Sequence, residues 1–233
     1  MQLVVSNVVV VAKSFNPSIF SQPWLVRNGV VGEEEFLPGC VFVEGLSQVM
    51  TRSFDMLVVP DRLQFSPKAE PHGEGDAAPA VAVPEGELIT DKVGKIIRTL
   101  PHTPYIAVGI NFVWQEPPQG NEGISELSRR LFGNPHSAIH REFAAVDARF
   151  GTYMSKDISG GMRLKFDIKP AIVAVPTGGT EDRLVLVVNF HKEIAEGDRV
   201  QQVVDTVGRW NECKQQATAL VELAVRGEDN RDH

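Results

Sequence analysis

Two histidines, four residues apart, come nearest in this chain to a group that could do chemistry. They are His136 and His140 in the stretch "NPHSAIHREFAAVDARF", with the carboxylates Glu142 and Asp147 nearby. If this stretch is helical, both imidazoles share a face and can hold a divalent metal ion. A zinc protease helix carries H-E-x-x-H, whereas Ser137 follows the first histidine here. We therefore expect no bound metal, and a metal-dependent hydrolase is retained as an alternative.

Other catalytic signatures are missing from the sequence. No serine lies in G-x-S-x-G, and no glycine-rich loop has the lysine or the flanking strand and helix needed to hold a phosphate. His102 and His191 have no neighbouring residues that mark a catalytic group, and Cys40 and Cys213 stand far apart with no metal-ligand spacing. The sequence thus favours a non-enzymatic protein without a cofactor.

The stretch "MRLKFDIK" predicts a strand with one buried and one solvated face. Its alternation points four apolar side chains to one side and four charged ones to the other. Three of the charged residues are basic, in a chain of net charge −7, and form a candidate docking surface for an acidic protein. The candidate binding residues are these three and two tryptophans that anchor either the core or an interface: Arg163, Lys165, Lys169, Trp24 and Trp114.

Composition limits the class of partner and the compartment. The charge of −7 disfavours general binding to nucleic acid, although a binder remains an alternative if basic residues gather on one sheet face. Those residues would be Arg52, Arg62, Arg163, Lys165 and Lys169. No apolar run reaches the ~18 residues of a membrane helix, and the apolar start of the chain has no signal-peptide pattern. With two free thiols, we expect a cytoplasmic protein.

A short internal repeat indicates how the chain is organised. "DKVGKIIRTL" covers residues 91–100 and "DRVQQVVDTV" covers residues 198–207, and both place aliphatic residues at i, i+3, i+4 and i+7. This spacing predicts two amphipathic helices, with Asp91 and Asp198 as their N-terminal caps. We expect Pro101 to end the first helix and the second to continue to Gly227.

The segments around the repeat predict an α+β fold with an internally duplicated β-α-β-β-β-α unit. The sheet, or sheets, should be largely antiparallel with helices on one face, because turn signals such as "SGG" join successive strands. The predicted halves are residues 1–103 and 104–233, with a flexible insertion at 68–87. The predicted strands are 4–15, two within 40–60, 62–67, 105–115, 150–158, 161–176 and 183–194, and the further helices are 18–29 and 123–133.

These observations together favour one class of function. We expect a non-enzymatic, macromolecule-binding protein of the cytoplasm, with a protein partner, acting through protein–protein interaction or as an accessory subunit. The sequence does not indicate the oligomeric state.

Overall fold

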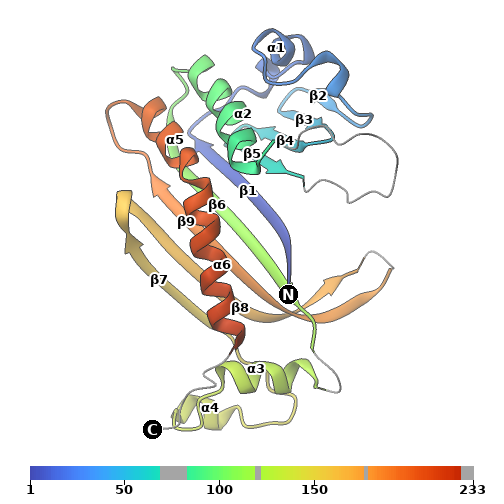
Figure 1. Ribbon diagram of the computed structural model, residues 1–233, viewed down its shortest axis with the longest axis vertical. Helices are drawn as coiled ribbons and strands as arrows, with labels where there is room; N and C mark the ends of the chain where they lie inside the picture. The colour runs from blue at the N-terminus through green and yellow to red at the C-terminus, as the bar shows by residue number, and fades with distance from the viewer. Residues whose placement is uncertain (69–82, 119–121, 176–177, 227–233) are drawn as a thin grey trace. The chain divides into compact units, whose positions relative to one another are not determined.

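A computed structural model describes residues 1–68, 83–118, 122–175 and 178–226, which form a mixed α+β fold (Figure 1). In this part of the chain nine strands form one antiparallel sheet with the order β2-β3-β4-β5-β1-β6-β9-β8-β7. The strands are β1 Gln2–Ala12, β2 Val41–Val43, β3 Leu46–Met50, β4 Phe54–Val59, β5 Arg62–Pro67, β6 Tyr105–Glu116, β7 Thr152–Ile158, β8 Met162–Ala174 and β9 Thr180–Glu193.

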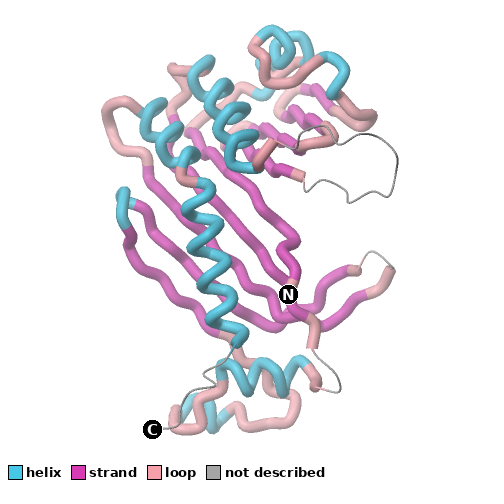
Figure 2. The backbone as a smooth tube through the Cα atoms, in the orientation of Figure 1, coloured by secondary structure: helices cyan, strands magenta, loops and turns pink. Residues whose placement is uncertain are grey.

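Along the chain, the helices come between these strands and after the last of them, and Figure 2 shows them in cyan. The α-helices are α1 Gln22–Arg27, α2 Glu85–Thr99, α3 Ile124–Phe132, α4 Ala138–Glu142, α5 Arg199–Gly208 and α6 Trp210–Arg226. Short 3-10 turns lie at η1 Pro17–Ile19, η2 Glu33–Glu35 and η3 Ser159–Gly161. None of the described helices is long and apolar enough to span a bilayer.

Contacts divide the chain into two compact units, each built from more than one segment. Unit 1 contains residues 1–5, 112–190 and 214–233, and unit 2 contains residues 6–111 and 191–213. Strands β1, β6 and β9 and helix α6 contribute residues to both units. The predicted halves 1–103 and 104–233 are a division by sequence similarity, and the contact units do not test that prediction.

The core of unit 2 lies between one face of its strands and helices α2 and α5. Strand register places Val8, Phe65, Met56 and Val49 side by side across β1, β5, β4 and β3, and all are buried. The aliphatic stripes of the two helices pack here as the repeat predicted, because an amphipathic helix buries its apolar face. The stripe residues with at most 8% exposure are Val93, Ile96, Ile97, Val203, Val204 and Val207.

The core of unit 1 confirms the alternation predicted for "MRLKFDIK". Met162, Leu164, Phe166 and Ile168 are at most 4% exposed, whereas the intervening charged residues are half-buried or exposed. Strand β9 repeats the pattern, with every second residue from Leu184 to Phe190 fully buried. The "SGG" turn joins β7 to β8 as predicted, and it is made of η3 with Gly160 and Gly161 at positive φ, a conformation that favours glycine.

The first repeat helix begins earlier than the repeat predicts. Helix α2 starts at Glu85, directly after Pro84, because proline suits the start of a helix and acidic residues favour its first turn. Asp91 therefore lies inside α2, where it forms an i,i+4 ion pair with Lys95 at 2.9 Å. The predicted cap at Asp91 is wrong, and the predicted insertion 68–87 ends too late. Of that insertion, residues 69–82 lie outside the described part.

The second repeat helix begins as predicted but ends early. Asp198 caps α5, since its Oδ1 accepts a hydrogen bond of 2.9 Å from the Gln201 N–H. The helix then stops at Gly208, and α6 starts at Trp210, so the predicted single helix to Gly227 is wrong. The helix ends here because glycine has a low helix propensity. The Arg209 N–H donates a hydrogen bond of 3.1 Å to the Thr206 carbonyl, three residues back. The first half also has one more strand than predicted, the short β2.

These two aspartates give a matched test of the helix boundaries. We expect Asp198→Ala to lower the free energy of unfolding by about 1 kcal/mol, because a capped backbone N–H loses its acceptor. Asp91→Ala should cost only about 0.3–0.5 kcal/mol, the value of an exposed i,i+4 ion pair. Urea unfolding followed by circular dichroism measures both, and equal losses would contradict this assignment.

Candidate binding surfaces

The histidine pair lies at the start of α4 and not within one helix. His136 is in the turn before the helix, and its backbone N–H donates to Asn134 Oδ1 at 3.0 Å. His140 accepts a hydrogen bond from the Asn134 N–H on Nδ1 at 2.7 Å, and its ring lies 5.1 Å from that of Phe150. In the described residues no three His, Cys, Asp or Glu side chains come together as a metal site. The helical geometry that would place both imidazoles on one face is therefore not formed.

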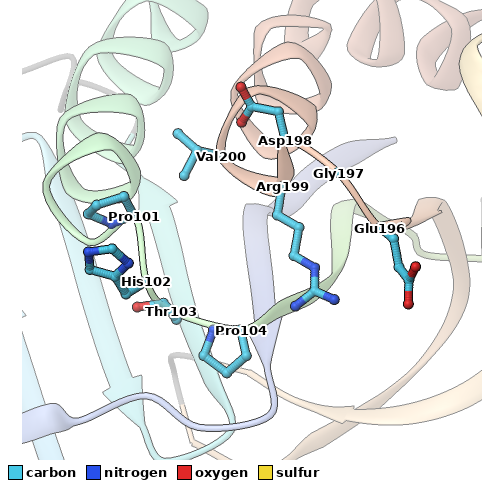
Figure 3. Close-up of a pocket in the computed structure, with 9 residues that line it drawn as sticks. All are labelled: Pro101, His102, Thr103, Pro104, Glu196, Gly197, Asp198, Arg199 and Val200. Atoms are coloured by element: carbon cyan, nitrogen blue, oxygen red, sulfur yellow. The ribbon is translucent and has the colours of Figure 1, made fainter.

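A surface pocket of about 690 Å³ lies in unit 2 between the loop after α2 and the start of α5 (Figure 3). It is lined by Pro101, His102, Thr103, Pro104, Glu196, Gly197, Asp198, Arg199 and Val200. Figure 3 shows the His102 ring and the Glu196 carboxylate at opposite sides of the pocket. The Asp198 carboxylate is already engaged in capping α5. The titratable groups around this pocket do not converge as an acid–base pair does.

The two thiols differ in environment. Burial raises the pKa of the Cys213 thiol to about 12, because the thiolate would lose its solvation in the core. Cys40 is half-buried, and its Sγ accepts a hydrogen bond of 3.3 Å from the Met50 N–H. Neither thiol forms a disulfide. Cys213 is therefore a core residue and not a nucleophile at neutral pH.

The predicted basic row lies on the solvated face of β8, and two of its three cations are paired within the hairpin β7–β8. Arg163 binds Asp157 at 3.1 Å and also donates to Ser155 at 2.9 Å. Lys169 binds Asp167 at 2.7 Å. The row is thus a set of ion pairs with little net charge, which differs from the cluster of free cations that binds phosphates.

Lys165 is the cation of this row without an ion pair among the described residues. It is half-buried and lies opposite Ser155 in the register of β7 and β8. Because its neighbours neutralise one another, Lys165 carries the local positive charge of this face. A single unpaired cation of this kind can select an acidic group on a partner.

The two candidate tryptophans have different surroundings. Trp114 belongs to unit 1, is 5% exposed, and lies 5.9 Å from the ring of Phe112, so it is part of the core. Trp24 belongs to unit 2, is half-buried on α1, and lies 5.2 Å from the ring of Phe20. Their roles in binding stay predictions, and only Trp24 presents part of its surface.

A second surface, which the sequence did not indicate, lies on the face of unit 2 opposite its core. Register aligns Val9, Gln64, Leu57 and Gln48 across β1, β5, β4 and β3 on that face, and all four are half-buried. We call these four residues the amide–aliphatic row. In β1 the run "NVVVV" places valine on both faces of the strand, so the sequence alone does not predict which valines face away from the core. In β5, the alternation of Leu63 and Phe65 with Gln64 could have predicted that Gln64 faces away from the core.

Comparison with known proteins adds no family: no protein family model, no curated protein sequence and no solved structure matches this chain.

The thiol environments lead to a direct test. We expect iodoacetamide at about pH 8 to modify Cys40 in the folded protein and to leave Cys213 unmodified, because only the thiolate reacts. Both should react in urea. Peptide mass spectrometry over time measures the two rates, and equal modification of both thiols in the folded chain would contradict the burial of Cys213.

Proposed function

We propose that this chain is a non-enzymatic binding protein whose partner is another protein, docked on the face of the sheet opposite the core. The observation that carries the proposal is the amide–aliphatic row of unit 2. Its side chains are uncharged and partly exposed, and the centres of protein interfaces are depleted in charge in the same way. Amide groups on such a row can hydrogen-bond a partner while the aliphatic groups are buried against it.

The charges of the chain favour protein over nucleic acid as the partner. The net charge is −7, and Arg163 and Lys169 on the solvated face of β8 are held by Asp157 and Asp167. A surface that follows phosphates needs several cations free to replace counterions. A partner with an acidic group near Lys165 fits this face better than a nucleic acid does. The free thiols Cys40 and Cys213 support a cytoplasmic location, where thiols stay reduced.

Two variants on these surfaces should weaken binding in different ways. Affinity purification of the full chain from its native host identifies the partner, whose binding is then measured with purified proteins. We expect Gln64→Arg to raise the dissociation constant at least about tenfold, because a cation would be buried without a counter-ion. Lys165→Glu, on unit 1, should mainly slow association, by about two- to tenfold at low salt, since exposed charges steer encounter with a partner.

The matched control is Lys13→Glu, which makes the same charge change at an exposed residue after β1. It should leave both the dissociation constant and the association rate unchanged. Thermal unfolding confirms that each variant is folded. Binding of the Gln64 and Lys165 variants at wild-type strength and rate would show that the partner docks elsewhere.

We also propose that the chain arose by internal duplication of one α+β unit. The order of the sheet supports this: β1 and β6, the first strands of the two halves, are neighbours, and the last strand of each half, β5 or β9, comes next outward. The preceding strand of each half, β4 or β8, follows in turn. Aliphatic stripes at equal spacing in α2 and α5 add a second correspondence.

A superposition tests the duplication. In a crystal structure, residues 4–100 should superpose on residues 105–225 with β1 on β6, β5 on β9 and β4 on β8. Residues 93–100 and 200–207 should then occupy equivalent places on their strands. Unrelated placements of these two helical segments would refute the duplication without affecting the binding proposal.

A further inference from the structure

We propose that β7 is a dimerisation edge, which pairs antiparallel with β7 of a second copy of this chain about a two-fold axis that passes between the two Ser155 residues. Strand β7 forms the rim of the sheet in unit 1 and takes no part in the docking face proposed above. The exposure of β7, its regular geometry and the order of its side chains support the dimer.

Strand β7 has one hydrogen-bonded neighbour in the described part of the chain. It ends the strand order and pairs with β8, and Figure 1 shows it as an outer strand. Its residues from Tyr153 to Asp157 are all exposed, with Tyr153 at 61% and Met154 at 50%. Alternate N–H and C=O groups of such an edge point away from its neighbour and can accept another strand.

Two of the usual protections of an edge strand, a bulge and a proline, are missing from β7, whereas a third is present, since the strand carries the charged side chains of Lys156 and Asp157. The strand has 7 residues paired without interruption to β8, from Thr152 opposite Ile168 to Ile158 opposite Met162. It therefore has no bulge, and it contains no proline. At the other end of the sheet the outer strand β2 is short, with only 3 residues. Long regular edges without bulge or proline are the ones that pair with further strands.

Symmetry selects one register for this pairing. An axis perpendicular to the sheet keeps each face on its own side, so it must lie midway between two copies of the same residue, and opposite residues share a face. With the axis at Ser155, all residues of β7 are paired: Thr152 faces Ile158 of the second copy, and Tyr153 faces Asp157. Shifting the axis to Met154 or Lys156 leaves residues at the ends of the strand without a partner in β7.

Charge supports the same register. With the axis at Ser155, no like charges face each other, and the Tyr153 hydroxyl lies where it can donate to the Asp157 carboxylate of the second copy. Met154 faces Lys156, whose methylene stem can cover the thioether. With the axis at Lys156, the two ammonium groups would face each other, which destabilises a strand pair.

The size of this contact sets its strength. One pair of seven-residue strands buries less than the ~1,600 Å² of a standard stable interface. We therefore expect a reversible dimer with a dissociation constant of about 1–500 µM. The two copies would present their Lys165 faces on the same side of the joined sheet, because the axis does not exchange the faces.

Sedimentation velocity of the full chain, from about 1 µM to 1 mM, tests the dimer. Met154→Lys should weaken the dimer about tenfold, because the introduced lysine faces Lys156 of the second copy at two symmetric places. The double variant Met154→Lys with Lys156→Glu should restore it, since each introduced lysine then faces an introduced glutamate. Lys156→Glu alone places a carboxylate opposite Met154 and serves as the control, with about wild-type affinity.

The results distinguish a β7–β7 dimer centred on Ser155 from a monomer and from a dimer that uses another contact or register. Circular dichroism and thermal unfolding check that each monomer is folded, which these exposed positions should allow. A chain that stays monomeric over the whole range overturns the proposal, as does a dimer that Met154→Lys leaves unchanged. Loss of the dimer in Met154→Lys without recovery in the double variant overturns the register centred on Ser155.

Discussion

The burial of one face of an antiparallel sheet is the interaction on which both units of this protein depend. Side chains alternate between two faces along each strand, and here every second residue of β9 from Leu184 to Phe190 is fully buried. Each such side chain contributes about 1.5–3 kcal/mol relative to an exposed one. The same alternation commits the intervening residues to the opposite face. The surfaces that we propose for binding are therefore a geometric consequence of how the core is made.

Much of the fold was predictable because the local periodicity of apolar residues indicates which side of each strand or helix is buried. The alternation in "MRLKFDIK" predicted which side of β8 is buried, and the aliphatic spacing predicted the packed stripes of α2 and α5. The helix boundaries were less predictable. Asp91 and Asp198 occupy equal places in the repeat, yet Pro84 and the acidic residues after it start α2 about two turns earlier. A boundary depends on which residue first satisfies the free N–H groups, and the repeat alone does not contain that information.

The candidate site was harder to predict than the fold. Three basic residues on one face of β8 suggested a positive surface, but Asp157 on the neighbouring strand neutralises Arg163. That pairing depends on the register of β7 and β8, which sequence spacing does not fix. The amide–aliphatic row likewise requires the register of four strands before its members can be seen as one surface. Local charge and local hydropathy describe a strand, whereas a binding surface is a property of several strands together.

Continuity between the two units has a consequence for how the protein unfolds. Strands β1, β6 and β9 and helix α6 each give residues to both units, so neither unit is made of elements of its own alone. Opening one unit would remove part of a continuous strand or helix from the other, and the free energies of opening are therefore linked. Amide protons at the middle of β6 should be exposed to solvent only by global unfolding. We therefore expect the two units, although each is compact by contact, to unfold together as one cooperative unit.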